Sequence, residues 1–192
     1  MEGDRAALFI EEFDVQYISR LYFADNKVFK AVLKKSQKAL TKGLISERSR
    51  WRGALYEKEL ERGYAAPLEI KWLSYEKEYG LVASKDFKKG DYIGEYAGMV
   101  RKTSSLDAKN SYCFEYLIGG EKRSRFTIDA REMGNELRFA NHCDEPNCET
   151  AEAYALGLLH IILLARKPVK KGEELTYDYG PTYWAKRNCP VD

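Results

Sequence analysis

The hydrophobic pattern of the first third of the chain has the 3.6-residue period of amphipathic helices. Two sets of apolar side chains recur at this spacing, Ile10, Phe13, Tyr17 and Leu21, and then Phe29, Val32, Leu33 and Leu40. Each set predicts a helix, and Gly43 would cap the second one. A third helix is predicted over residues 46–62, where Gly63 would end it, although Gly53 in its interior costs about 1 kcal/mol relative to alanine.

After Pro67 the period changes to two residues, which indicates short strands. Alternating stretches cover residues 69–73, 80–84 and 92–100. Residues 111–118 and 124–129 predict a hairpin around Gly119 and Gly120, and residues 153–164 predict another around Gly157. Two similar turns, F-K-K-G-D-Y-I and V-K-K-G-E-E-L, would be corners of similar β units. The pattern predicts an α+β chain, with a helical N-terminal region (1–66), a mainly β body (67–180) and a short tail (181–192).

Composition is typical of a folded globular protein, since 44% of the 192 residues are hydrophobic and 32% are charged. The longest apolar run, residues 153–165, is too short to span a bilayer. The first residues, M-E-G-D-R-A, lack the basic start and apolar stretch of a secretory signal. These features predict a protein without membrane contact, in the cytoplasm or on the nucleoid or chromatin, with export by a route without a cleaved signal left open.

The net charge of +2 hides a basic N-terminal region, because residues 15–52 hold ten Lys/Arg against two Asp/Glu. Five lysines lie largely off the apolar stripe: Lys30, Lys34, Lys35, Lys38 and Lys42. They form either a solvated helix face or a contact surface for nucleic acid or another polyanion. Few aromatic residues lie among them, so stacking on bases is not indicated.

The four cysteines, Cys113, Cys143, Cys148 and Cys189, form no C-x-x-C pair, so free thiols and no zinc site are expected. Three other segments carry the strongest motifs. In chain order they are G-D-Y-I-G-E-Y-A-G (residues 90–98), G-N-E-L-R-F-A-N-H-C-D-E-P-N-C (134–148) and G-E-E-L-T-Y-D-Y-G (172–180). Together they resemble the signature of the SET-domain protein lysine methyltransferases, over residues 68–180. The resemblance implies the mainly β SET fold, with small sheets and a β-clip in which the Asn-His segment lies in a pseudoknot.

A lysine methyltransferase must desolvate its target amine, and aromatic walls suit this task. Tyr177 and Tyr179 flank Asp178, and strand alternation puts them on one face. The resemblance makes Tyr179 the catalytic tyrosine and Tyr177 a switch for the number of methyl groups added. Tyr112 joins these two as a third predicted catalytic residue, and Phe114 joins them as a wall of the lysine channel.

The resemblance also implies S-adenosylmethionine as the methyl donor and S-adenosylhomocysteine as the product. The implied binding residues are Lys77, Glu78, Tyr79, Gly80, Leu81, Tyr112, Arg138, Phe139, Asn141, His142, Tyr179 and Trp184. Glu78 replaces the first glycine of the family's glycine-x-glycine. The rival interpretation of His142 is a metal ligand.

The sequence departs from many SET enzymes after the core. Asp144 stands where a zinc-binding cysteine follows Asn-His-Ser in those enzymes, and the tail offers only Cys189, so no structural zinc is expected. Tyr183 and Trp184 are candidates to close the active site in its place, or they pack on the body for stability. The compact length and the missing cysteines look more like small bacterial or viral SET proteins than like large chromatin enzymes.

The sequence thus predicts a protein lysine N-methyltransferase that adds one or two methyl groups to a basic, lysine-rich protein. A histone or histone-like protein is the expected substrate. The sequence does not distinguish this substrate from a non-histone target such as a ribosomal component. Four acidic residues near the Asn-His pair would steer such a chain: Asp144, Glu145, Glu149 and Glu152. The alternative is a catalytically weak SET-shaped interaction module whose basic helices bind nucleic acid or a protein partner. The oligomeric state stays open.

Overall fold

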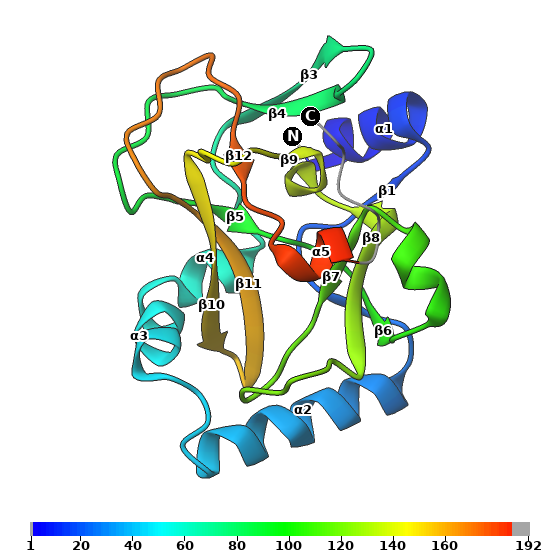
Figure 1. The fold of residues 1–192 in the computed structure, drawn as a ribbon, viewed down its shortest axis with the longest axis vertical. Coiled ribbons are helices and arrows are strands. Elements are labelled where there is room, and N and C mark those ends of the chain that lie inside the picture. The colour runs from blue at the N-terminus through cyan, green and yellow to red at the C-terminus, as the bar shows by residue number, and fades with distance from the viewer. Residues whose placement is uncertain (1, 186–192) are drawn as a thin grey trace.

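The computed structural model describes residues 2–185, apart from the side chains of residues 2–4 and 182. Within this range the strands form four small sheets, and helices lie around them (Figure 1). The largest sheet contains β1 (Gln16–Tyr17), β2 (Tyr22–Phe23), β6 (Gly98–Lys102), β7 (Cys113–Glu115) and β8 (Phe126–Gly134). The second contains β5 (Tyr92–Glu95), β10 (Cys148–Ala155) and β11 (Leu158–Ala165). The predicted mainly β body of small sheets is confirmed.

Two smaller sheets complete the body. The antiparallel pair β3 (Leu68–Ser74) and β4 (Glu78–Ala83) forms one, and the parallel pair β9 (Asn141–His142) and β12 (Thr176–Tyr177) forms the other. The helices are α1 (Glu2–Phe13), α2 (Asn26–Thr41), α3 (Glu47–Leu55), α4 (Glu57–Arg62) and α5 (Pro181–Ala185), with 3₁₀ turns η1 (Ser105–Lys109) and η2 (Glu136–Phe139). Among the described helices, none has the length and apolar character that crossing a bilayer requires.

The helix predicted from the first apolar set ends earlier than its pattern indicates. α1 stops at Phe13, and Asp14 adopts a left-handed conformation with φ of 52°. Tyr17 then lies in β1, which pairs in parallel with Met133 and Gly134 of β8. Pairing with β8 outweighs the local preference of this segment for a helix. A short apolar pattern cannot indicate such pairing with a distant strand.

The second predicted helix is confirmed as α2. The Asp25 side chain accepts a hydrogen bond from the backbone N–H of Val28 at 2.7 Å, which caps the first turn. Gly43 follows the helix with φ of 67°, and the N–H of Leu44 donates to the carbonyl of Ala39 at 2.9 Å, as in a Schellman ending. The buried face consists of Val28, Val32, Ser36 and Ala39, one position away from several residues of the predicted stripe.

The third predicted helix is divided into α3 and α4 at Tyr56. The Tyr56 hydroxyl donates to the carbonyl of Gly90 at 3.2 Å, and its ring packs 4.9 Å from the ring of Tyr92. These contacts with the β body hold the backbone of Tyr56 out of the helical conformation. Gly63 ends α4 with φ of 61°, as predicted.

We expect Gly53→Ala to destabilise the protein by about 1–3 kcal/mol, because a β-carbon at position 53 would overlap the backbone carbonyl of Tyr154 on β10. At an exposed helix position the same change would stabilise by about 1 kcal/mol. Urea unfolding measures the difference. A gain in stability would show that α3 does not pack as closely on β10 as the structure has it.

The predicted strand over residues 92–100 is divided into β5 and β6, which belong to different sheets. β5 pairs with β11 and β6 pairs with β8, so the chain passes from one sheet to the other at Tyr96 and Ala97. Both predicted hairpins are confirmed, since β7 pairs antiparallel with β8 and β10 pairs antiparallel with β11. The crossing at Tyr96 places β5 and β6, which are consecutive in the chain, in two different sheets.

The two similar Lys-Lys-Gly turns lie side by side. Phe87 and Val169 exchange backbone hydrogen bonds of 2.8 and 3.0 Å, and Gly90 and Gly172 both have φ near 90° (89° and 91°). Equivalent sequences thus form equivalent corners that pair with one another.

The N-terminal helical region shares its core with the β body. Phe9 and Val32 belong to the same buried cluster as Ile93, Ile128 and Leu175. Helix α2 lies across the end of the molecule where the β10–β11 turn and the β7–β8 loop meet (Figure 1). The division of the chain at residues 66 and 67 stays a prediction, because a shared core does not show which part folds alone.

Candidate functional site

The site is built where two distant segments pair in parallel. Thr176 and Tyr177 of β12 lie opposite Asn141 and His142 of β9. The segment before β9 is fixed by Asn135, whose side chain caps η2 and donates to the carbonyl of Glu95 at 2.7 Å. The motifs at residues 134–148 and 172–180 are therefore held together by backbone pairing, next to β5.

Tyr177 and Tyr179 come together as their spacing predicts, with ring centroids 4.8 Å apart. The Tyr179 hydroxyl donates to the carbonyl of Ala140 at 3.0 Å, and the Tyr179 N–H donates to Nδ1 of His142 at 3.3 Å. Tyr177 is buried, whereas Tyr179 is half-buried. The hydroxyl of Tyr179 is thus held in one place beside the Asn-His strand.

A cleft of about 770 Å³ opens beside these two rings. Part of its wall is aromatic, formed by Tyr96, Phe114, Tyr177, Tyr179 and Tyr183. The structure brings Phe114, Tyr177 and Tyr179 to one cleft, and the role of this cleft as a lysine channel stays a prediction. Aromatic walls would desolvate an alkyl amine and stabilise a cationic product through their faces.

Burial raises the pKa values of Tyr96 and Tyr177 well above the usual range of tyrosine, and electrostatic interaction with neighbouring tyrosines raises them further. Their hydroxyls therefore stay protonated at physiological pH. Tyr96 uses its hydroxyl to donate to the carbonyl of Tyr112 at 2.9 Å. The buried tyrosines of the cleft can orient groups through hydrogen bonds, but they cannot serve as bases.

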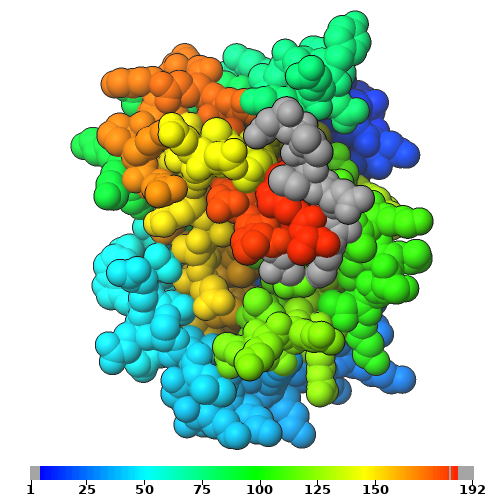
Figure 2. Space-filling view, viewed as in Figure 1, coloured from blue at the N-terminus to red at the C-terminus, as the bar shows by residue number. Residues whose placement is uncertain are grey.

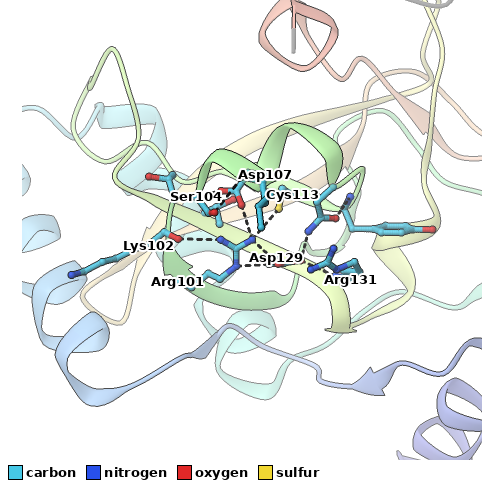
Figure 3. Close-up of polar contacts among 12 residues, drawn as sticks. Arg101, Lys102, Ser104, Asp107, Cys113, Asp129 and Arg131 are labelled. Atoms are coloured by element: carbon cyan, nitrogen blue, oxygen red, sulfur yellow. Dashed lines mark hydrogen bonds and ion pairs between the residues drawn. The ribbon is translucent and has the colours of Figure 1, made fainter. Parts of the chain in front are cut away.

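Tyr112 does not line the cleft, although its neighbours Ser111 and Cys113 do. Its ring and its backbone N–H are each held by a separate set of contacts. The Arg138 guanidinium lies 3.8 Å from the centre of the Tyr112 ring, and Arg138 Nε donates to the carbonyl of Ala130 at 2.7 Å. The Tyr112 N–H donates to Asn110, which donates in turn to Asp129 at 2.8 Å. Figure 3 shows this polar network, in which Arg101 also binds Asp129.

The strand predicted to bind the methyl donor lies against Asn141. The Asn141 amide donates to the carbonyl of Tyr79 at 3.2 Å and to the Glu174 carboxylate at 3.0 Å. Lys77 forms an ion pair with the same carboxylate at 2.9 Å. A β-carbon at Gly80 would overlap the side chain of Leu73 and come within 3.2 Å of the Asn141 amide nitrogen. Gly80 is therefore required for this close approach.

Leu81 differs from the other predicted residues of this strand. Its side chain is fully buried in the core, and its carbonyl accepts from the N–H of Leu175 at 2.7 Å. In this structure it joins β4 to the segment before β12.

Glu78, which stands in place of the first glycine, has φ of 55°. A left-handed conformation costs an L-residue about 1–2 kcal/mol. We expect Glu78→Gly to stabilise the protein by about 1 kcal/mol in urea unfolding, because glycine adopts this conformation without the steric penalty. Glu76→Gly is the matched control in the same turn, since Glu76 is not among the residues with positive φ. Equal effects of the two changes would contradict the strain at Glu78.

The C-terminal helix α5 packs its aromatic side chains against Tyr179. The ring of Tyr183 lies 4.5 Å from that of Tyr179, and the Trp184 ring lies 6.1 Å from it in a stacked orientation. Trp184 also meets His142 edge-on at 4.8 Å. In Figure 2, α5 lies on the same face as the loop after β7, which lines the cleft. Residues 186–192 of the predicted tail, including Cys189, lie outside the described residues.

Both ring nitrogens of His142 have protein partners, since Nε2 lies 3.1 Å from the Asp144 carboxylate and Nδ1 accepts from Tyr179. Among the side chains described within residues 5–185, no three His, Cys, Asp or Glu residues gather in a way that could hold a metal ion. Burial raises the pKa of Cys113 to about 11 and that of Cys148 to about 12, so neither thiol is a nucleophile at neutral pH. The metal-ligand interpretation of His142 has no support in these contacts.

Sequence reasoning gave no role to Tyr96, although it lies inside the G-E-Y-A-G motif. Its position at the crossing between two sheets puts its ring in the cleft wall, 5.5 Å from the ring of Phe114. A strand break at Tyr96 would have indicated this role in the sequence. The pattern over residues 92–100 predicts one strand without a break.

The residues predicted to bind the donor contact one another in this structure. Trp184 meets His142 edge-on, and the Asn141 amide donates to the Tyr79 carbonyl beside Gly80. Binding of S-adenosylmethionine by these residues stays a prediction.

Small sheets around a paired Asn-His and Tyr-x-Tyr segment are consistent with a SET-type fold. The chain belongs to the SET-domain family: the family described as SET domain matches residues 78–180, more than half of the chain. Relatives include the histone-lysine N-methyltransferase trithorax of Drosophila melanogaster, 37% identical over 107 residues, and ash1 of the same species, 35% identical over 130 residues. A human histone-lysine N-methyltransferase named as H3 lysine-36 specific is 34% identical over 110 residues.

These relatives are much longer proteins. The match to trithorax covers 52% of this chain and 3% of that protein, and the match to ash1 covers 63% of this chain and 6% of that protein. For the human relative the shares are 54% and 4%. The shared part is therefore the SET domain.

Proposed function

We propose that this protein transfers a methyl group from S-adenosylmethionine to the ε-amine of a lysine in a histone or histone-like basic protein, and that it adds one or two groups. The observation that carries the proposal is the placement of Tyr179. Its hydroxyl is held beside the Asn-His strand, and its ring faces an aromatic cleft that is large enough for a side chain. The names of the relatives support the reaction type and the substrate class. A histone substrate would bring the protein to chromatin.

The target amine must lose its proton before it can react. A lysine with an ordinary pKa near 10.4 is only about 0.04% neutral at pH 7. The cleft wall of Tyr96, Phe114 and Tyr177 would desolvate the amine and so favour its neutral form. Because the buried tyrosines stay protonated, the proton leaves to solvent before the lysine is enclosed.

The donor supplies an activated methyl group on a positively charged sulfur. The residues that would hold it are Asn141, Tyr79, Gly80, His142 and Trp184. The hydroxyl of Tyr179 would orient the amine and the methyl group in line, which is the main requirement of a displacement between two bound groups.

We expect Tyr177→Phe to raise the proportion of di- and trimethylated product. Tyr177 is buried and lines the cleft, and its hydroxyl would hold a water in the place that further methyl groups need. Intact-mass analysis of a methylated peptide measures the product distribution. Tyr154→Phe, on β10 and not among the residues lining the cleft, is the control. An unchanged product distribution in the Tyr177 variant would contradict the role of Tyr177 in limiting the number of methyl groups.

The first test of the function is transfer of labelled methyl groups to mixed histones and to a bacterial histone-like protein, with calorimetry of donor binding alongside. Transfer to lysine establishes the enzyme. Donor binding without transfer leaves the fold and site assignment intact and excludes the tested substrates. Absence of both binding and transfer would favour the interaction module.

The interaction module has one observation in its favour. Three exposed lysines lie on α2 (Lys30, Lys34 and Lys38) and a fourth, Lys42, is its exposed C-cap residue, whereas Lys35 is half-buried and paired with Glu121. A face of this kind would bind nucleic acid through phosphates, with an affinity that falls steeply with salt. Gel-shift titration at two salt concentrations, with the four lysines changed to glutamine, tests this contact.

A further inference from the structure

The cleft has two chemically different ends. The aromatic end holds the residues described above, and the other end is formed by hydroxyl and basic side chains: Thr103, Ser104, Ser105, Lys122, Arg123 and Ser124. These come from two segments that lie side by side, because the N–H of Thr103 donates to the carbonyl of Arg125 at 3.1 Å. The Thr103 hydroxyl also donates to the carbonyl of Ser124 at 3.5 Å. The segments continue the pairing of β6 with β8 beyond Lys102 and Phe126.

Lys122 and Arg123 are both exposed, and neither has an ion-pair partner within residues 5–185. Other basic residues of the body are compensated, since Lys170 pairs with Asp86 and Lys77 pairs with Glu174. Two neighbouring cations at the wall of a cleft, with the hydroxyls of Ser104 and Ser105 in the same lining, form a surface that attracts an anion.

The described carboxylates of the cleft form no ion pair with Lys122 or Arg123. Asp107 lies in the wall, but it binds Arg101 at 2.7 Å and accepts from the N–H of Ser104 at 3.0 Å. Figure 3 shows its side chain directed to Arg101. Glu115 is the other carboxylate in the described wall, so the lining cations and carboxylates are equal in number, and the attraction for an anion rests on Lys122 and Arg123 having no ion pair of their own among the described residues. The four acidic residues expected to steer a basic substrate do not line the cleft.

We propose that the substrate of this enzyme carries an anionic side chain, aspartate, glutamate or a phosphorylated serine, close in sequence to the target lysine. With the lysine in the aromatic end, this anionic group binds Lys122 and Arg123 and accepts hydrogen bonds from the hydroxyls of Ser104 and Ser105. The inference rests on the proposed function and narrows its substrate to lysines with an acidic or phosphorylated neighbour within an otherwise basic protein.

The test uses the full chain and peptides with one central lysine, in which aspartate, asparagine, phosphoserine or serine is moved through the positions on both sides. At one register we expect kcat/KM to be about tenfold higher for aspartate than for asparagine, since two partly exposed ion pairs together give about this factor. The gain lies in KM and decreases with salt. A larger gain for phosphoserine than for aspartate identifies a phosphorylated target, and the reverse identifies a carboxylate.

Charge reversal provides the specific check. Lys122→Glu with Arg123→Glu is expected to remove the preference for aspartate and to favour a basic residue at the same register, with kcat little changed. The matched control is Lys88→Glu with Lys89→Glu, an exposed basic pair that is not among the residues lining the cleft. Transfer without any charge preference, or an equal effect of the control pair, overturns the inference alone. Absence of transfer to every peptide and protein overturns the proposed function as well.

Discussion

Tyr179→Phe is expected to lower the rate of methyl transfer by about 10²-fold or more, with the fold unchanged. The Tyr179 hydroxyl is held by the carbonyl of Ala140, next to the strand that carries Asn141 and His142. Phenylalanine keeps the ring contacts with Tyr177 and Tyr183 but removes the only group of this side chain that can orient the amine and the methyl group. Single-turnover kinetics with labelled donor measure the loss in the chemical step.

Tyr183→Phe is the matched control for this prediction. Its ring lies 4.5 Å from that of Tyr179 and it lines the same cleft, so it removes a hydroxyl from the same aromatic cluster. We expect less than about a tenfold loss in this variant, since Tyr183 lies on α5, outside the paired Asn-His and Tyr-x-Tyr segments that hold the Tyr179 hydroxyl. A Tyr179 variant with nearly full activity, or a Tyr183 variant that is equally impaired, would move the catalytic role away from Tyr179.

Removal of Glu95 or His160 is expected to destabilise the fold by about 3–5 kcal/mol, because each leaves a buried partner uncompensated. Both residues are almost fully buried, at 2% and 5% exposure, and His160 Nδ1 lies 2.5 Å from a Glu95 carboxylate oxygen. His160 Nε2 lies 3.2 Å from the carbonyl of Ala155. Urea unfolding of Glu95→Gln and His160→Gln measures the loss.

The exposed pair of Lys170 and Asp86 is the control, because its side chains are 73% and 60% exposed. Asp86→Asn should cost no more than about 1 kcal/mol. A loss of similar size at the two pairs would show that burial does not govern the contribution of Glu95 and His160.

The same buried pair predicts a pH dependence of stability. Burial disfavours the charged imidazolium, but the Glu95 carboxylate outweighs this effect and raises the pKa of His160 above its ordinary value. Protonated His160 therefore favours the folded state. This contribution is complete below the ordinary histidine pKa and is lost as the pH rises through the raised pKa of the folded protein. The measurement is the unfolding free energy of the wild type minus that of His160→Gln as a function of pH. An increase of this difference with rising pH would contradict the stabilising role of protonated His160.

Several parts of the fold follow from local sequence, because local interactions decide them. Helix α2 has its own cap at Asp25 and its own ending at Gly43, and the two hairpins have glycine turns between alternating strands. The Tyr-x-Tyr spacing predicts that the rings of Tyr177 and Tyr179 meet, and the structure agrees. The three motifs together indicate the family, although each alone is weak.

Other features could not be predicted from local patterns, because contacts between distant segments decide them. Tyr17 leaves its helical pattern to pair with β8, and Tyr56 interrupts a helix to reach Gly90. Tyr96 lines the cleft only because β5 and β6 join different sheets. The hydrophobic period of a segment does not specify which distant strand the segment will pair with.

The sequence by itself determined the family, the mainly β body, the identity of the predicted catalytic tyrosine and the excess of basic residues near the N-terminus. The tertiary structure decided which of these residues meet. It joined the Asn-His and Tyr-x-Tyr segments, directed Asp107 to Arg101, and left Lys122 and Arg123 without a counter-ion among the described residues at one end of the cleft. The physical reason is that a side chain's charge and type are local properties, whereas its compensation and burial depend on segments that only the folded chain brings together.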